Sequence, residues 1–178
     1  MKYKIQLAKL NDIEQISNLI QLSARKLAGQ FYKKDTIESA LKGAFGVDSQ
    51  LIKDQTYYLI YNKDQMIACG GWSYRKTLFG SDTNNLRDAQ KLNPKTEAAK
   101  IRAFFIHPEY ARQGLGLQLL NLCEEKAKKQ GFKQTQLMST LSGIGFYKKN
   151  DYHGDKYIYH GMNDSNEIKF LPMIKSLD

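Results

Sequence analysis

One segment near the middle of the chain, residues 107–116, constrains the fold most. It reads His-Pro-Glu-Tyr-Ala-Arg-Gln-Gly-Leu-Gly. Residues 98–107 have the apolar and aromatic composition of a strand, which ends at Pro108 because proline has no backbone N–H for a β-ladder. Beyond the segment, apolar residues recur at helical spacing until Gly131: Leu115, Leu119, Leu122 and Cys123. The sequence therefore predicts a strand, a glycine-containing loop and an amphipathic helix in succession.

The two glycines of this loop point to an anion. Gly114 and Gly116 lack a Cβ, so the backbone N–H groups around them can approach a ligand closely. The helix that begins near Leu115 directs the positive end of its dipole at the same place. The dinucleotide fingerprint fails because its third glycine position is Leu119, and no Gly-Lys-Ser/Thr follows. The pattern favours a pyrophosphate cradle, and a loop that only turns the chain is the alternative.

The rest of the chain alternates helices and strands. Apolar periodicity predicts strands at 3–7, 56–61, 65–74, 135–138, 157–159 and 168–174, and helices at 13–27, 35–41 and 142–149. Pro172 favours a place for the last strand at the edge of the sheet. The polar stretch 75–95 is long for a structureless loop, which is typical of functional or mobile segments.

Composition excludes several classes of protein. The chain has 178 residues, 42% of them hydrophobic and 25% charged, as expected for one folded domain. No apolar run reaches the roughly 18 residues of a membrane span. Polar residues interrupt residues 1–15, so no signal peptide is predicted and we expect a cytoplasmic protein. Cys69 and Cys123 are expected to be buried thiols, and the three scattered histidines indicate no metal site.

The net charge points to an anionic partner. Lys and Arg number 27 against 18 Asp and Glu, which gives a formal charge of +9. The basic residues come in pairs rather than in the dense block of a nucleic-acid tail. A phosphorylated small molecule stays open as the partner, and no nucleic acid is expected.

Three segments resemble the GNAT superfamily of acyl-CoA-dependent N-acyltransferases: Ile-Arg-Ala-Phe-Phe-Ile-His-Pro at 101–108, Tyr-Ala-Arg-Gln-Gly-Leu-Gly at 110–116 and Gly-Phe-Tyr-Lys-Lys-Asn-Asp-Tyr at 145–152. The resemblance implies an α/β (α+β) fold in a single N-acetyltransferase domain over residues 1–178. Its sheet is twisted and mixed, with about seven strands and about four flanking helices. The two central parallel strands, about 101–106 and 135–138, splay apart.

The resemblance also implies acetyl-CoA as co-substrate and no metal. The main chain of the phosphate loop would hold the pyrophosphate, and that of Phe105 and Ile106 the pantetheine arm. The loop residues are Arg112, Gln113, Gly114, Leu115, Gly116 and Leu117. Ala111 occupies a position where the family usually has Gln or Arg, so no side-chain role is expected there.

The family's activity implies an acid and a base. Tyr147, in Gly-Phe-Tyr-Lys-Lys, is expected to protonate the CoA thiolate when a primary amine attacks directly in a ternary complex. The family glutamate position is Lys100, a poor base unless strongly desolvated, which leaves Glu97 or an ordered water. The alternative is a non-catalytic acyl-CoA-binding sensor or scaffold. The acceptor is expected to be a small-molecule or peptide amine, no membrane partner is expected, and a homodimer stays open.

Overall fold

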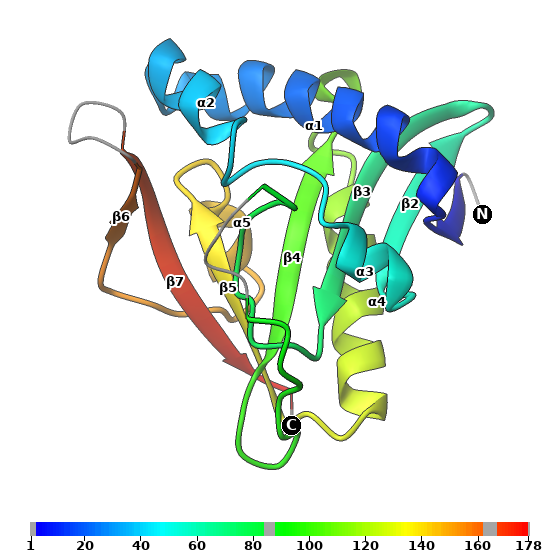
Figure 1. Cartoon of the computed structure of the whole chain (residues 1–178), viewed down its shortest axis with the longest axis vertical. Coiled ribbons are helices and arrows are strands. Elements are labelled where there is room, and N and C mark those ends of the chain that lie inside the picture. The colour runs from blue at the N-terminus through cyan, green and yellow to red at the C-terminus, as the bar shows by residue number, and fades with distance from the viewer. Residues whose placement is uncertain (1–2, 84–87, 162–166, 178) are drawn as a thin grey trace.

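The computed structural model describes residues 3–83, 88–161 and 167–177. In these residues seven strands form one mixed sheet in the order β1-β2-β3-β4-β5-β7-β6 (Figure 1). The strands are β1 (Lys4–Leu7), β2 (Tyr57–Asn62), β3 (Gln65–Ser73), β4 (Ala99–Ile106), β5 (Gln134–Thr140), β6 (Ile158–His160) and β7 (Ile168–Ser176). The predicted seven-stranded mixed sheet is confirmed.

Helices cover both faces of the sheet. They are α1 (Ile13–Lys26), α2 (Lys34–Ala40), α3 (Ser49–Lys53), α4 (Leu115–Lys129) and α5 (Ile144–Lys148). The described residues thus contain five helices, where about four were expected. The short α3 is one turn, begun by Asp48, whose side chain accepts a hydrogen bond from the N–H of Gln50. None of the described helices is long and apolar enough to cross a membrane.

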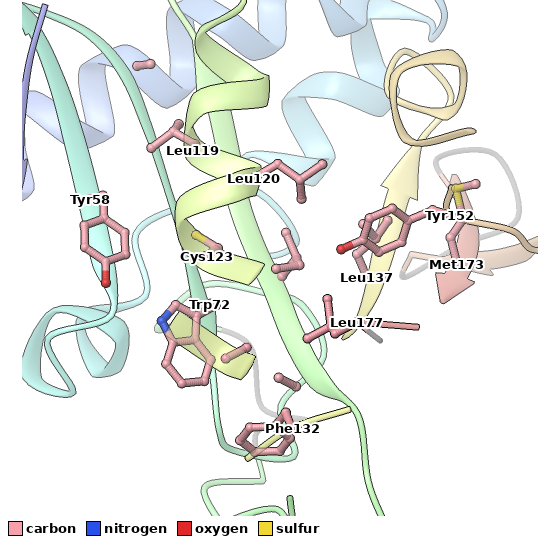
Figure 2. Close-up of a cluster of buried hydrophobic side chains, with 14 of the residues drawn as sticks. Tyr58, Trp72, Leu119, Leu120, Cys123, Phe132, Leu137, Tyr152, Met173 and Leu177 are labelled. Carbon is pink, nitrogen blue, oxygen red and sulfur yellow. The ribbon is translucent and has the colours of Figure 1, made fainter. Parts of the chain in front are cut away.

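The sheet separates two hydrophobic cores. Side chains alternate along β2, so that Tyr58 and Ile60 face α4 while Tyr57 and Leu59 face α1. Figure 2 shows the α4 side, where Cys123 of the helix lies near Trp72 of β3. Both cysteines are buried and unbonded, as predicted. The result is three layers, with α1 and α2 on one face of the sheet and α4 on the other (Figure 1).

The central parallel pair is short. β4 and β5 pair only at Ala99↔Thr135 and Lys100↔Gln136, and beyond these residues the strands diverge toward the α1 end of the sheet (Figure 1). The first four residues of β4 are buried and the last four are partly exposed. β4 therefore leaves the core where it leaves β5, and the predicted splay is confirmed.

A β-bulge in β4 lies three residues after the last pair with β5. Cys69 pairs with Phe105 and Gly71 with Arg102, so Gly70 alone lies opposite two residues of β4, 103 and 104. Ala103 has a φ of 53°, and its carbonyl accepts a hydrogen bond of 2.9 Å from the Tyr57 hydroxyl. Bulges bend a strand and increase its twist, which adds to the divergence of β4 from β5.

The last strand is not at the edge of the sheet, so the expectation from Pro172 was wrong. β7 lies between β5 and β6. Ile174 exchanges both backbone hydrogen bonds with His153, on the side away from β5. Position 172 shares that side by alternation, and β6 pairs only with residues 168–170. The missing N–H of Pro172 therefore falls where no partner strand needs it.

A buried ion pair ties β4 to the segment that precedes it. The Arg102 guanidinium is 2.9 Å from the Asp48 carboxylate, and both side chains are at most 3% exposed. Arg102 also donates to the carbonyl oxygens of Thr77 and Gly80. The described residues 75–83 of the polar stretch are thus fixed to the sheet, whereas residues 84–87 of that stretch lie outside the described residues.

Removal of Asp48 tests this anchor. Asp48→Ala leaves Arg102 charged, buried and without its carboxylate, and we expect a loss of about 3–5 kcal/mol in the free energy of unfolding. Urea denaturation measures it. The control is Glu125→Ala, which removes an exposed partner of Lys129 and should leave the unfolding midpoint unchanged. A midpoint for Asp48→Ala equal to that of the control would contradict the assignment.

Candidate active site

The loop between β4 and α4 has a defined shape. It begins with a 3-10 turn, η3 (Pro108–Tyr110), in which His107 Nδ1 accepts a hydrogen bond from the N–H of Glu109. Arg112 and Gly114 then adopt left-handed φ values of 64° and 82°. Such residues reverse the chain locally, and α4 begins directly after the second of them.

Side chains outside the loop hold it in place. Gln113 accepts a hydrogen bond from the Tyr3 hydroxyl and donates one to the carbonyl of Glu109. The Tyr3 and Tyr110 rings pack edge to face at 6.4 Å. The Leu115 side chain is buried in the core under α4, so the first helical residue is fixed from below.

The first turn of α4 leaves its backbone N–H groups unbonded among the described residues, at the place where the sequence predicts a cradle. Within the described residues, the backbone N–H groups of 112–117 make no hydrogen bond, and no side chain caps the helix. Its first turn contains no acidic residue. A Cβ on Gly114 would have no atom within 4 Å, so the approach is open. Free N–H groups and the helix dipole together fit a phosphate anion. All six predicted loop residues are brought together here.

Tyr147 lies next to this cradle on α5. The helix packs against the first turn of α4, where a Cβ on Gly116 would be 3.4 Å from the Phe146 ring. The Tyr147 ring packs edge to face on Phe146 at 5.0 Å and on Tyr152 at 5.6 Å. The structure therefore brings the predicted acid and the predicted cradle to the same end of β4 and β5.

The Tyr147 phenol has the properties of a proton donor. Burial raises its pKa above the ordinary tyrosine value, so the group is protonated at neutral pH. Its hydroxyl forms no hydrogen bond within the described part of the chain, in contrast to the Tyr152 hydroxyl, which contacts Thr135 and Glu124. The Tyr147 hydroxyl is thus available to a ligand.

The two residues predicted to hold a ligand along β4 differ in orientation. The N–H of His107 donates to the carbonyl of Ile67 on β3, and by alternation the backbone groups of Phe105 also face β3. Those of Ile106 face the opposite side, toward β5. The N–H of Ile106 is 3.3 Å from Ser23 Oγ of α1. Only the backbone of Ile106 therefore borders the space between β4 and β5, and Phe105 does not.

Glu97 lies away from the other predicted residues. It precedes β4, whereas the cradle follows β4, and an eight-residue strand separates the two by roughly 25 Å. Its carboxylate accepts a hydrogen bond from the N–H of Asn93 and lines a shallow pocket with Lys133 and Ser176. Glu97 thus lies at the start of β4, away from the cradle, and its role as the base stays a prediction.

Lys100 lies at the point where the two strands separate. It is 9% exposed, and its Nζ donates a 2.8 Å hydrogen bond across the strands to Gln136 Oε1. Burial lowers the pKa of this ammonium, although Glu97 opposes the shift. Burial thus shifts the Lys100 pKa downward, which is the direction that a role as a base would require.

Two features of the site were missed from the sequence. Ser23 occupies an apolar, core-facing position of α1, and a buried serine in such a stripe is a detectable signal. The bulge at Ala103 was signalled only indirectly, by glycine in β3, because a Cβ on Gly70 would lie 2.5 Å from the Phe104 ring. Among the described residues, no group of three His, Cys, Asp or Glu side chains could hold a metal.

Comparison with known proteins bears on this site. The sequence profile of the Acetyltransferase (GNAT) family matches residues 19–152. No curated protein sequence matches the chain.

Solved structures with a similar fold include a GCN5-related N-acetyltransferase from Rhodopseudomonas palustris. Its TM-score is 0.71 at 13% identity, with 99% of this chain and 96% of that chain covered. The PaiA N-acetyltransferase from Thermoplasma acidophilum, in complex with coenzyme A, has a TM-score of 0.66 at 16% identity, with 99% of each chain covered. YncA, a putative acetyltransferase from Salmonella typhimurium with its cofactor acetyl-CoA, has a TM-score of 0.65 at 11% identity, with 100% of this chain and 95% of that chain covered.

A pair of glycine variants tests the cradle. Gly114→Val places a side chain in front of the free N–H groups, and we expect it to abolish the rise in melting temperature that CoA causes. Gly131→Val is the matched control, because Gly131 has a similar φ of 90° at the other end of α4. Both variants carry the strain of a left-handed valine. Equal CoA shifts in the two variants would show that the ligand lies elsewhere.

Proposed function

The chain belongs to the GNAT acetyltransferase family, and on that premise we propose that it transfers an acetyl group from acetyl-CoA to a primary amine bound at the same time. One observation carries the proposal. The Tyr147 phenol, protonated and without a hydrogen-bond partner among the described residues, lies on a helix that packs against the anion cradle, beside the strands that diverge. A proton donor and a phosphate site along one pair of diverging strands fit a carrier whose thiol and phosphate ends are joined by an extended arm.

The residues present fit CoA by their chemistry. The N–H groups of 113–117 bind its pyrophosphate at the positive end of α4. The exposed Arg112 adds a guanidinium beside them, and the net charge of +9 draws the anion toward the protein. The backbone of Ile106 pairs with an amide of the pantetheine arm. The pantetheine arm lies along β4, in the position that β5 would occupy if the two strands stayed paired.

Acetyl-CoA supplies a thioester, whose acetyl carbon forms a bond to the amine nitrogen as its bond to sulfur breaks. Tyr147 donates its phenolic proton to the departing sulfur, so that a neutral thiol leaves instead of a thiolate. The attacking nitrogen releases one proton to solvent and the Tyr147 phenolate regains one from solvent, so the reaction consumes no net proton. General acid catalysis of this kind contributes roughly 10²–10⁴-fold to a rate.

A second candidate is a non-catalytic sensor or scaffold that binds acyl-CoA. The observation in its favour is that a lysine, Lys100, and not a carboxylate occupies the point where β4 and β5 diverge, while the nearby Glu97 carboxylate accepts a hydrogen bond from the N–H of Asn93. The two candidates share the cofactor and differ in turnover, so the assay below separates them.

The first test measures binding and turnover together. We expect CoA to stabilise the protein by about 2.7 kcal/mol at a hundredfold excess over its dissociation constant, without added metal. Acetyl-CoA with a panel of amino acids, small amines and peptides should release free thiol, with mass spectrometry identifying the acetylated amine. Stabilisation by CoA without thiol release across the panel would favour the sensor.

Two tyrosine variants test the acid. Tyr147→Phe removes only the hydroxyl, and we expect kcat to fall by roughly 10²–10⁴-fold while the affinity for CoA is unchanged. Tyr152→Phe is the control. It removes a neighbouring hydroxyl that is already hydrogen-bonded, so it should lower stability by about 1–3 kcal/mol and leave kcat near wild type. Near-native kcat in Tyr147→Phe would exclude Tyr147 as the acid.

A further inference from the structure

Tyr32 joins three parts of the chain through its hydroxyl. The residue lies between the 3-10 turn η2 (Ala28–Gln30) and α2, and its N–H donates to the carbonyl of Ala28. Its ring packs on the core of the α1 face. The hydroxyl donates a 2.7 Å hydrogen bond to the carbonyl of Lys169 in β7, and it accepts one of 2.7 Å from the N–H of Leu141, directly after β5. The phenol thus both donates to the main chain and accepts from it.

The hydroxyl occupies the place of the next bond in the ladder between β5 and β7. The last pair of these strands is Thr140↔Phe170, and in the same register Leu141 would pair next with Lys169. The backbone groups of Ile174 face away from β5, so by alternation those of Lys169 face toward it. A direct bond from the N–H of Leu141 to the carbonyl of Lys169 would therefore continue the ladder. The hydroxyl lies between these two groups and ends the pairing.

The end of β5 determines where α5 begins. The N–H of Gly143 donates to the carbonyl of Thr140, and the N–H of Tyr147 donates to the carbonyl of Gly143. The Tyr147 ring lies against this turn, because a Cβ on Gly143 would be 3.1 Å from the ring and 3.0 Å from Ser139 Oγ. One tight turn and the first turn of α5 thus connect the Leu141 N–H to the Tyr147 phenol. A shift at the end of β5 therefore moves the phenol with it.

We propose that Tyr32 is a positioning residue, whose hydroxyl keeps the end of β5 apart from β7 and thereby fixes the position of the Tyr147 phenol. The inference rests on the proposed function and adds to it a residue that acts through the acid. Without the hydroxyl, the N–H of Leu141 can reach the Lys169 carbonyl directly. The ladder then extends by one pair and draws the turn before α5 toward β7. A displacement of about 1 Å at a reacting group can lower a rate by roughly 10²-fold.

The chemistry of the Tyr32 phenol suits this role. Burial raises its pKa to about 12, although the hydrogen bond from the Leu141 N–H opposes the shift. The phenol therefore keeps its proton at neutral pH and donates it to the Lys169 carbonyl. The Tyr147 hydroxyl, in contrast, forms no hydrogen bond within the described part of the chain. One buried tyrosine thus supports the main chain, and the other is available to a ligand.

A double-mutant cycle tests whether Tyr32 acts through Tyr147. We expect Tyr32→Phe to lower kcat by roughly 10–10²-fold, while the rise in melting temperature that CoA causes stays as in wild type. In a Tyr147→Phe background the same change should lower kcat by less than about twofold, because the acid is already absent. The control is Tyr61→Phe, which removes a hydroxyl that contacts Gln15 of α1 on the same face of the sheet. It should leave kcat unchanged in both backgrounds.

Two kinetic results would overturn the proposal. An equal fold loss in both backgrounds would show that Tyr32→Phe acts independently of Tyr147, as a general loss of packing does. A near-native kcat in Tyr32→Phe would show that its hydroxyl positions no group that the reaction needs.

Fluorine NMR tests the position of Tyr147 without any turnover. In protein labelled with 3-fluorotyrosine, the Tyr147 resonance is assigned by its absence in Tyr147→Phe. It should shift by more than its line width in Tyr32→Phe and stay in place in Tyr61→Phe. An unchanged resonance in Tyr32→Phe would contradict the proposal. If the wild type releases no thiol and the resonance still shifts, the proposed function fails, while the placement of Tyr147 by Tyr32 is upheld.

Discussion

The site depends on one extra residue in β4. The first two residues of that strand pair with β5 and the later ones do not, and the bulge at Ala103 bends the strand further away from β5. A non-glycine residue in the left-handed region carries strain of about 1–3 kcal/mol. The Tyr57 hydroxyl bonds the Ala103 carbonyl, and the missing side chain of Gly70 leaves room for the Phe104 ring. These contacts offset the strain and keep the strands apart.

The bulge also decides which side chains face which helix. Because Arg102 and Ala103 both face α1, the alternation shifts by one residue, and Phe104 and Ile106 then face α4. Phe105 faces α1 instead, where it packs edge to face on Phe45. Phe45 packs in turn on Phe170 of β7. Aromatic rings thus span from β4 to β7 and support the diverging strands on the α1 face without backbone pairing.

Features that depend on interactions between residues close in sequence could be predicted, and features that depend on contacts between distant strands could not. The cradle could be predicted because a positive φ, a missing Cβ and a helix dipole act within a few residues of Gly114. The bulge could not be predicted, because the sequence around Ala103 is ordinary. The residue that makes room for the bulge is Gly70, which lies on another strand. The place of Pro172 was misjudged because the backbone N–H of a strand residue points to one neighbouring strand only. At position 172 it would point away from β5, where β6 does not pair with β7.

Lys100 and Arg102 show how one strand treats two buried cations differently. Arg102 has Asp48 and two carbonyls, so its charge is compensated and holds residues 75–83 against the sheet. Lys100 has only the Gln136 amide. A lysine whose pKa is lowered by folding binds fewer protons in the native than in the unfolded state between the lowered value and about 10.4, so stability rises with pH across that window. Below the lowered pKa the folded chain bears the full penalty of the buried ammonium. Burial of the Lys100 ammonium therefore costs the folded protein stability at neutral pH, whereas the paired Arg102 guanidinium on the same strand helps to hold the fold together.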